Sequence, residues 1–351
     1  MYPNYNYNYS YQPFYESPEM KQKRLLRRDS NAISLAVLGF VGLSFVAAIV
    51  FSLLSMAVSP AADILASGKL DPAVELLLYL LNSVLTAAPP FLIMAKIMKI
   101  PTAFYMPLSK PKGGASLSLV VFGFGACMFA QLVSMLITVG MSGIGLKEPE
   151  FPLPEAAGIP EKIIMLIGIS VFPGIVEEVI CRGVILQWLR RYGDGFAILV
   201  SSIIFGLIHM NLAQIPFAMM VGIALGYIAV RTESLIIPMI VHAANNAFSL
   251  LVEWFLPKIV PERDLELYFF CMIIIFILAG LLAMFYIDMK KRGFWKLEPH
   301  RSVLSPSACF KTFWGSVGAV IMTIVVVCFT LLTYLEPYMQ EWLDMLTRDM
   351  L

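Results

Sequence analysis

The sequence predicts an all-α membrane protein, a polytopic transmembrane helical bundle of about eight or nine spans. The first observation is composition: 59% of the 351 residues are hydrophobic and only 14% are charged, whereas soluble domains contain about 45–50% apolar and about 25% charged residues. The second is that the apolar residues are gathered in runs long enough for a spanning helix, which needs ~20 residues. The third is that basic residues collect between alternate runs, as they do in membrane proteins.

Residues 1–30 are predicted to form a disordered, Tyr- and Asn-rich cytoplasmic tail that ends in a basic cluster. The first twenty residues, MYPNYNYNYSYQPFYESPEM, show no apolar periodicity. They also contain no hydrophobic segment of the kind found in a cleavable signal peptide. The first apolar run begins near Ile33, directly after KQKRLLRRD. This order is typical of an uncleaved signal-anchor whose basic cluster stays in the cytoplasm.

Nine apolar runs follow, and they divide into three groups. We expect N-terminal transmembrane helices in 31–145, a core in 160–256 and C-terminal transmembrane helices in 264–351. The fifth and sixth runs are short and barely separated, so they form either two spans joined by a tight turn at Asn211 or a partly re-entrant pair. The runs lie near 33–58, 74–98, 115–140, 163–189, 196–212, 213–230, 234–256, 266–288 and 313–335.

The charges between the runs predict the orientation. With the N-terminus in the cytoplasm, 18 of the 25 Lys and Arg residues fall in inside segments and six in outside segments, while Arg182 lies within a span. The positive-inside rule expects this bias. The loop 147–162 is acidic and rich in proline, as a translocated loop can be. The net charge of only +1 gives no indication of a nucleic-acid partner.

The fourth run, KIIMLIGISVFPGIVEEVICRGVILQWLRR, carries three charged residues near its middle. Each charge facing lipid would cost at least ~2.5–3.5 kcal/mol. Glu178 and Arg182 are spaced i, i+4 and project within about 40° of each other, so we expect them to pair. Glu177 points about 100° away from Glu178 and is left available for chemistry. Pro173 and Gly174 should loosen the helix and leave a carbonyl unpaired, which would help water to enter. An interhelical salt-bridge network without catalysis is the alternative interpretation.

Two of the three histidines also lie in predicted spans. His209 follows Phe205 by four residues in the fifth run, and His242 precedes Asn246 by four in the seventh. Such spacing places each pair on one face of a helix. Asn245 is a weaker candidate than its neighbour. A lone histidine on an apolar helix is often only structural, but two of them beside a Glu-rich helix favour a shared site.

This set of side chains can hydrolyse a peptide bond. The reaction needs an activated water, a donor to the developing oxyanion and a proton for the leaving amine. A desolvated glutamate suits the base-then-acid role. The sequence has no HExxH zinc motif and no GxGD aspartyl pair.

The motifs Glu177-Glu178-x-x-x-Arg182, Phe205-x-x-x-His209 and His242-x-x-x-Asn246 resemble, in this order, the three motifs of the CPBP family. This family comprises CAAX-processing endopeptidases and their bacterial Abi or bacteriocin-processing relatives. The resemblance covers roughly 160–256. It implies that the chain is an intramembrane endopeptidase.

The resemblance also implies a role for each motif residue. Glu177 would be the catalytic base and His209 its partner on the water. His242 and Asn246 would stabilise the oxyanion, and Glu178 with Arg182 would organise the site. A zinc site of His₂Glu type, made by Glu177, His209 and His242, is chemically possible. We expect no cofactor, because no carboxylate outside the pair could then replace the base.

The family includes members that cleave prenylated CAAX tails and bacterial members linked to peptide maturation, bacteriocin self-immunity and surface-protein processing. We therefore expect the partners to be the lipid bilayer and a membrane-anchored or lipidated peptide substrate. The compact chain and the Tyr/Asn-rich tail favour a bacterial cell membrane as its location. A non-catalytic membrane immunity or binding protein of the same fold is one alternative. A transporter is another, although no internal repeat is visible.

Overall fold

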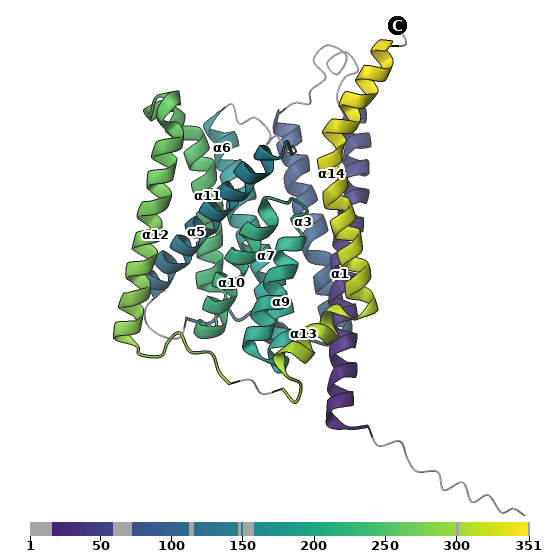
Figure 1. Cartoon of the computed structure of the whole chain (residues 1–351), viewed down its shortest axis with the longest axis vertical. Helices are drawn as coiled ribbons and strands as arrows, with labels where there is room; N and C mark the ends of the chain where they lie inside the picture. The colour runs from purple at the N-terminus through teal and green to yellow at the C-terminus, as the bar shows by residue number, and fades with distance from the viewer. Residues whose placement is uncertain are drawn as a thin grey trace, which may run out of the picture.

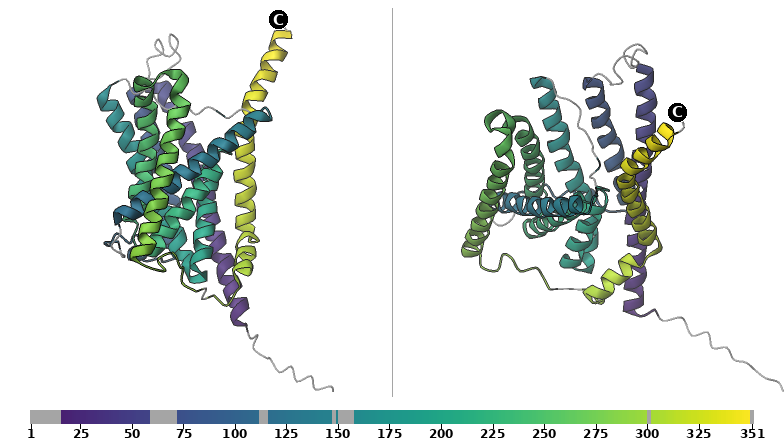
Figure 2. Two further views of the ribbon diagram at one scale, coloured as in Figure 1. Left: turned by 60° about the vertical axis from the view of Figure 1, so that its left-hand side comes forward. Right: turned by 45° about the horizontal axis from the view of Figure 1, so that its top comes forward.

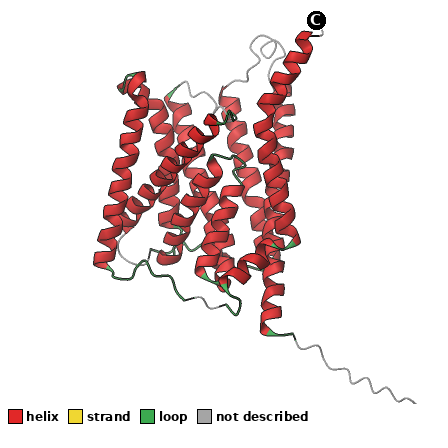
Figure 3. Ribbon diagram, in the orientation of Figure 1, coloured by secondary structure: helices red, strands yellow, loops and turns green. Residues whose placement is uncertain are grey.

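The structure is a computed structural model that describes residues 16–58, 72–111, 116–146, 149, 158–299 and 302–349. Every regular element in these ranges is a helix (Figure 3). The helices follow in the order α1 (Pro18–Val58), α3 (Pro72–Ile97), α4 (Thr102–Tyr105), α5 (Ser116–Gly143), α6 (Ile159–Met165), η1 (Leu166–Val171), α7 (Phe172–Glu178), η2 (Val179–Leu186), α8 (Gln187–Leu189), η3 (Arg190–Tyr192), α9 (Asp194–Leu207), α10 (Gln214–Thr232), α11 (Ile236–Ile259), η4 (Glu262–Asp264), α12 (Leu265–Lys290), α13 (Pro306–Trp314) and α14 (Val317–Asp349).

The predicted all-α membrane bundle is confirmed. Seven helical segments of the described chain are long and apolar enough to cross a membrane. Two shorter apolar helices, Leu85–Ile97 and Asp194–Leu207, fall in the second and fifth predicted spans. Each of the nine predicted runs therefore contains a helix, and α3, which includes Leu85–Ile97, has 26 residues in all. The seven segments are Pro18–Val50, Ser116–Gly143, Ile159–Tyr192, Gln214–Thr232, Ile236–Ile259, Glu262–Lys290 and Val317–Leu335.

The helices form two groups with the fourth span between them. On one side, α5 packs against α10, α11 and α12, and on the other, α1 packs against α3 and α14 (Figures 1 and 2). Helix α5 crosses its group obliquely (Figure 2). The span from α6 to η3, together with α9, contacts members of both groups.

Small residues allow the closest helix contacts. A Cβ atom added to Gly125 of α5 would lie 2.7 Å from the Cα atom of Gly280 on α12, so the two backbones touch. A Cβ on Gly123 would lie 2.9 Å from Val241 of α11. Lipid tails are as apolar as leucine side chains, so helices in a bilayer associate through such close packing rather than through the hydrophobic effect.

The fourth span is one continuous helical segment in which two π-helical stretches, η1 and η2, flank α7. Pro173 stands at the start of α7 and has no N–H to donate to the carbonyl of Ile169, four residues earlier. Asn246 of α11 donates to this carbonyl through Nδ2 at 3.3 Å. The carbonyl that we expected the proline to free is thus bound by a neighbouring helix.

Helix α1 begins earlier than the sequence predicts. Residues 18–30, which we expected in the disordered tail, are helical, while 1–15 lie outside the described residues. Glu19 and Lys23 form an i, i+4 ion pair of 2.7 Å, and Asp29 is completely buried. Asp29 accepts a hydrogen bond of 2.6 Å from the hydroxyl of Tyr192 and pairs with Arg191. Composition suggested a solvated basic segment, but these contacts with the end of the fourth span make it helical.

Helix α9 ends at Leu207, five residues before the predicted end of the fifth span at 212. His209 therefore lies in the turn after the helix, not within it. Met210 adopts a left-handed conformation with φ of 50°. The Asn211 side chain then accepts hydrogen bonds from the backbone N–H groups of Ala213 and Gln214 and caps α10. The structure thus has a turn at Asn211, and α9, with 14 residues, is shorter than the ~20 residues of a full span.

The basic segments lie at one end of the bundle. Gln22 near the start of α1 accepts hydrogen bonds from the backbone of Val303 and Leu304, in the connection between α12 and α13. Arg231 at the end of α10 lies over the ring of Phe294 in the same connection, 5.1 Å from its centroid. The C-terminus lies at the opposite end (Figure 1).

Candidate active site

The predicted pair of Glu178 and Arg182 forms and is completely buried. Glu178 Oε1 accepts a 2.7 Å hydrogen bond from Arg182 Nη1, and the side chains are 0% and 1% exposed. His242 joins the pair, because its Nδ1 atom lies 2.8 Å from the same carboxylate oxygen. Two helices, the fourth span and α11, are thus connected by one carboxylate that binds a cation and an imidazole.

Glu177 points to a different face of the helix and remains largely unbound. Its Oε2 atom has no hydrogen-bond partner among the described residues and lies 3.8 Å from His242 Nε2. The side chain is 26% exposed, whereas that of Glu178 is fully covered. His242 therefore stands between two carboxylates, with Nδ1 on Glu178 and Nε2 facing Glu177.

The ring of Phe205 contacts three of the polar side chains. The guanidinium carbon of Arg182 lies 4.3 Å from the centroid of its ring, at the distance of a cation–π contact. The rings of His209 and His242 meet Phe205 edge to face, with centroids at 4.9 and 5.7 Å. This explains the aromatic residue four positions before His209. Its ring contacts the guanidinium of Arg182 and the imidazoles of both histidines.

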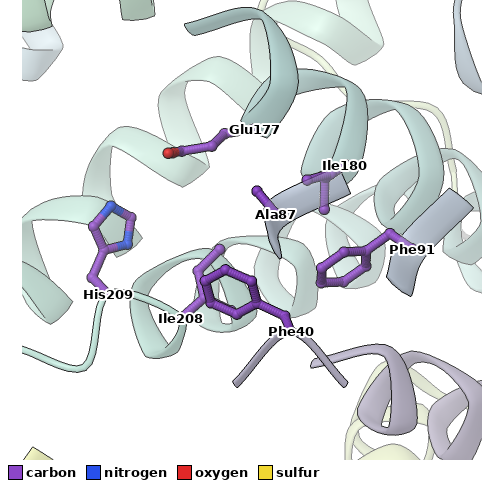
Figure 4. A pocket seen from close by; sticks show the side chains of 7 residues that line it. All are labelled: Phe40, Ala87, Phe91, Glu177, Ile180, Ile208 and His209. Atoms are coloured by element: carbon purple, nitrogen blue, oxygen red, sulfur yellow. The ribbon is translucent and has the colours of Figure 1, made fainter. Parts of the chain in front are cut away.

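His209 is oriented by the end of its own helix. Its Nδ1 atom lies 2.7 Å from the carbonyl oxygen of Phe205. A carbonyl only accepts hydrogen bonds, so Nδ1 is the donor and carries a proton. In the neutral ring, Nε2 is then the nitrogen that can accept a proton from water. The carboxylate of Glu177 extends toward this imidazole (Figure 4).

Glu177 and His209 share a cavity of about 90 Å³. The polar groups lie on one side of it and apolar side chains on the other (Figure 4). The apolar wall comes from α1, α3, η2 and the turn after α9. The lining residues are Phe40, Ala87, Phe91, Glu177, Ile180, Ile208 and His209.

Asn246 lies one turn beyond His242 on α11 and is half-buried. Its Oδ1 atom accepts a hydrogen bond of 3.3 Å from Nδ2 of Asn245. This contact fixes the amide so that Nδ2 faces the carbonyl of Ile169. An amide nitrogen has two hydrogens, and one remains for another acceptor. The ranking of Asn246 above Asn245 stays a prediction, and the sequence did not predict that Asn245 orients its neighbour.

The approach of α11 to α7 depends on Gly174. A Cβ atom at this position would lie 2.8 Å from the backbone nitrogen of Ala243 and 3.0 Å from its Cα atom. Any other residue would push the two helices apart. Because Ala243 follows His242 directly, this contact determines whether the imidazole reaches Glu178.

The residues proposed for zinc do not fit a three-ligand site in this arrangement. Within the described part of the chain, no three His, Cys, Asp or Glu side chains come close enough to hold one ion. His242 Nδ1 is bound to Glu178, and only its Nε2 atom faces Glu177. A tetrahedral site with His₂Glu ligands would need bond lengths of about 2.0–2.2 Å from all three.

The structure brings Glu177, Glu178, Arg182, His209 and His242 into one cluster around Phe205, and it places Asn246 one helical turn away. Sequence reasoning missed the apolar wall. Its members from α1 and α3 are Phe40, Ala87 and Phe91. They lie in runs that are apolar throughout, so nothing in the sequence distinguishes them from lipid-facing neighbours.

Comparisons with known proteins agree with the resemblance of the motifs. Residues 159–248 match the family described as Type II CAAX prenyl endopeptidase Rce1-like. The chain is 28% identical over 141 residues to the Bacillus subtilis (strain 168) protein named "Putative membrane peptidase YdiL", a match that covers 40% of this chain and 57% of that protein. It is 26% identical over 194 residues to the "Membrane-embedded CAAX protease MroQ" of Staphylococcus aureus (strain USA300), covering 53% and 75% of the two chains. No solved structure matches.

Proposed function

We propose that the chain, whose residues 159–248 match the Rce1-like family, is an intramembrane endopeptidase that uses Glu177 to activate water. One observation carries this proposal. The unbound Oε2 atom of Glu177 faces His242 Nε2 at 3.8 Å, at the edge of a cavity that also contains His209. A base without a structural partner, beside two imidazoles, is what hydrolysis of a peptide bond requires.

In this proposal, a water molecule binds between Glu177 and Nε2 of His209. Glu177 takes one proton from the water while the oxygen attacks the carbonyl carbon, and the carbonyl π electrons move onto its oxygen. The oxyanion is stabilised by a proton on His242 Nε2 and by the second amide hydrogen of Asn246. Glu177 then gives its proton to the leaving nitrogen as the C–N bond breaks.

Glu178 and Arg182 act through His242. Glu178 accepts the hydrogen bond from Nδ1 and thereby fixes the ring, as carboxylates do for catalytic and metal-binding histidines. When Nε2 also carries a proton, the imidazole is a cation, and the buried carboxylate next to it compensates the charge. Arg182 holds the Glu178 carboxylate in place through its 2.7 Å hydrogen bond.

The test is cleavage of membrane-anchored peptides by the purified protein in detergent micelles. Glu177→Gln should lower the rate by ~10²–10⁴, the usual contribution of a general base. The matched control is Glu253→Gln, the same change at an exposed position of α11, which should cleave at the wild-type rate. A folded Glu177→Gln protein that cleaves normally would contradict the proposed role.

We expect activity without a transition metal, because the site offers Glu177 as a base and no fitting set of three ligands. Metal content should be measured on active protein, and activity should be followed through exhaustive chelation. The expected result is an unchanged rate with no stoichiometric metal. Zinc at one equivalent whose removal and return abolishes and restores activity would contradict the metal-free mechanism.

The substrate and the location are part of the same proposal. The partners are the bilayer and a membrane-anchored or lipidated peptide, in a bacterial cell membrane. The N-terminus and the other basic segments would lie in the cytoplasm, in accordance with the 18-to-six bias. Their gathering at one end of the bundle supports this orientation.

A further inference from the structure

The first turns of α1 project past the other helices at the basic end of the bundle (Figure 1). Side chains on one face hold this segment in place. Gln22, Asp29 and Ser30 form hydrogen bonds with the connection before α13, with the end of the fourth span and with α13, respectively. The remaining surface is basic and is presented on a fixed helix. The basic residues of this segment are Lys21, Lys23, Arg24, Arg27 and Arg28.

The acidic residues of the segment do not neutralise this surface, because each of them already has a partner. The pairs are Glu16 with Arg24, Glu19 with Lys23 and Asp29 with Arg191. The Arg27 side chain is exposed and forms no hydrogen bond or ion pair within the described ranges of the chain. The Arg28 side chain is 58% exposed and lies 3.3 Å from the carboxylate of Asp29, which Arg191 and Tyr192 also bind. Positive charge is therefore left over for an external anion.

This basic surface continues the lipid-facing side of α1. Residues seven positions apart on a helix lie on one stripe that drifts by only ~20° per step. Leu35 and Ile49 on this stripe are 70% and 58% exposed, and a Cβ atom added to Gly42 between them would meet nothing within 4 Å. Arg28 and Lys21 are the next two positions of the same stripe toward the N-terminus. The side of α1 that faces acyl chains within the span therefore becomes basic where the span ends.

Two of the cations lie at the depth of lipid headgroups. The apolar run of α1 begins near Ile33, so Arg28 and Arg27 precede it by five and six residues, or ~7.5–9 Å along the helix. A bilayer has a hydrocarbon core of about 30 Å and measures about 40–45 Å with its headgroups, which gives each headgroup layer ~5–8 Å. The long side chain of arginine reaches along a surface into this layer. Its guanidinium presents paired N–H donors that fit phosphate oxygens.

We infer that the α1 basic surface, formed by Lys21, Arg24, Arg27 and Arg28, binds the anionic headgroups of phospholipids in the leaflet at this end of the bundle. A headgroup with a net negative charge supplies the phosphate and the charge that the surface lacks. A phosphatidylcholine headgroup carries its own cation and has no net charge, so it is the weaker ligand. This binding does not depend on hydrolysis of a peptide and is measured without turnover.

The first experiment counts bound lipids. Purified protein in uncharged detergent micelles would be titrated with phosphatidylglycerol or with phosphatidylcholine of the same acyl chains, and retained lipid would be measured by native mass spectrometry. Each Lys or Arg near an anionic surface contributes about fivefold in affinity, which corresponds to ~1 kcal/mol. Arg27→Gln/Arg28→Gln should therefore weaken retention of phosphatidylglycerol at least ~10-fold and leave that of phosphatidylcholine unchanged.

Two controls separate this surface from the overall charge and from the fold. Lys258→Gln/Arg263→Gln removes two positive charges at the opposite end of the bundle, where the Arg263 side chain is 85% exposed, and should retain phosphatidylglycerol like wild type. Arg27→Lys/Arg28→Lys keeps the charge and should retain most of the binding. Equal retention of both lipids by wild type would overturn the inference, and so would equal losses in the two glutamine double variants.

The second experiment distinguishes a lipid headgroup from free phosphate. A ligand that binds only the folded protein raises its melting temperature. Phosphatidylglycerol should raise the melting temperature of wild type, and Arg27→Gln/Arg28→Gln should lose at least half of that rise. Inorganic phosphate and glycerophosphoglycerol at the same concentration should produce no rise. An equal rise with either soluble phosphate would show that the surface binds phosphate without the lipid, and the absence of a rise with phosphatidylglycerol would also contradict the inference.

Discussion

Glu177 and Glu178 are neighbours in sequence with opposite surroundings. Glu178 is completely buried between Arg182 and His242, while Glu177 is partly exposed and its Oε2 atom has no hydrogen-bond partner in the part of the chain that the structure describes. The difference follows from the helix, which turns about 100° per residue and so sends the two side chains to different faces. One carboxylate is structural, and the other can accept a proton.

Substitutions in this pair should separate stability from activity. Glu177→Gln should lower the cleavage rate by ~10²–10⁴ and leave the melting temperature nearly unchanged, since no described residue forms a hydrogen bond with its Oε2 atom. Arg182→Ala strands the buried Glu178 and should lower the free energy of unfolding by ~3–5 kcal/mol. Glu178→Gln should lie between the two. Melting temperature and cleavage rate would be compared in the same detergent.

The opposite pattern would reject these roles. If Glu178→Gln is folded and inactive while Glu177→Gln cleaves normally, the base has been assigned to the wrong carboxylate. If Arg182→Ala melts at the wild-type temperature, the buried pair does not stabilise the protein in the way that its geometry indicates.

The polar part of the site could be predicted from the sequence because polar groups in lipid are costly. An unpaired charge in lipid is costly, so Glu178 and Arg182 were each expected to form an ion pair, and their i, i+4 spacing showed that they can pair with each other. The contact of His242 with Glu178 could not be predicted, because it depends on how α11 packs. Phe91 could not be identified either, since an apolar side chain costs nothing in lipid and its burial leaves no trace in the sequence.

At the scale of elements, the crossing of α7 and α11 depends on the missing side chain of Gly174. Gly174→Ala should force the backbone of Ala243 away and cost about 1–3 kcal/mol, as overpacking usually does. It should also lower the cleavage rate, because His242 follows the displaced helix. Ala243→Gly should restore only part of the loss, since two of the three contacts involve backbone atoms.

A matched glycine provides the control for this prediction. Gly42 lies within α1, and a Cβ atom there would meet nothing within 4 Å. Gly42→Ala should therefore leave the melting temperature unchanged or raise it, because alanine is the better helix former by about 1 kcal/mol. If both substitutions behave alike, the α7–α11 crossing has no special dependence on glycine.

The turn that carries His209 is fixed by helices outside the matched segment. The hydroxyl of Tyr334 on α14 donates to the Asn211 side chain at 3.2 Å, and Ser134 of α5 donates to the carbonyl of Ala213 at 3.0 Å. Helix α9 has only 14 residues, or ~21 Å, so this turn lies at a depth where backbone groups need partners within the protein.

Tyr334→Phe should therefore reduce kcat with little change in KM. Loss of the hydroxyl frees the turn, and a displacement of about 1 Å at a catalytic group can lower the rate by up to ~10²-fold. Unfolding free energy should fall by only about 1 kcal/mol, as for one hydrogen bond. Tyr338→Phe is the control, because its hydroxyl donates to Gly145 instead. Equal kcat values for the two variants would show that Tyr334 does not position His209.

The sequence predicted which runs form helices but not where all of them end. The end of α9 at Leu207 was missed because Ile208, Met210 and Leu212 alternate with the polar His209 and Asn211, and the role of Asn211 as a cap shows only in its side-chain contacts. The start of α1 at Pro18 follows a local N-cap that the sequence prediction did not use: the Ser17 side chain accepts a hydrogen bond of 3.2 Å from the backbone N–H of Met20, and proline occupies the first helical position. By contrast, the burial of Asp29 against Tyr192 joins segments far apart in the chain, so local pattern does not reveal it.

For the whole molecule, the ends of the bundle should face opposite sides of the membrane. Single cysteines would be placed in a cysteine-free variant, in the 302–305 segment and at Gly158, and treated in intact cells with a thiol reagent that cannot cross membranes. Gly158 should be labelled and the 302–305 segment protected, because basic segments stay inside. The reverse pattern would invert the orientation, and labelling of both would contradict the arrangement of the helices.

The two π-helical stretches of the fourth span have a consequence for its rotational phase. Each π turn holds one residue more than an α turn, because its hydrogen bonds reach five residues back rather than four. A helical wheel drawn for a uniform α-helix therefore gives wrong directions for side chains between Ile159 and Tyr192. Each π-helical stretch rotates the residues that follow it by about one residue, or ~100°, relative to such a wheel. The two glutamates lie in the ordinary α-helical section between the stretches. Their direction relative to either end of the span is set by how many residues η1 and η2 contain.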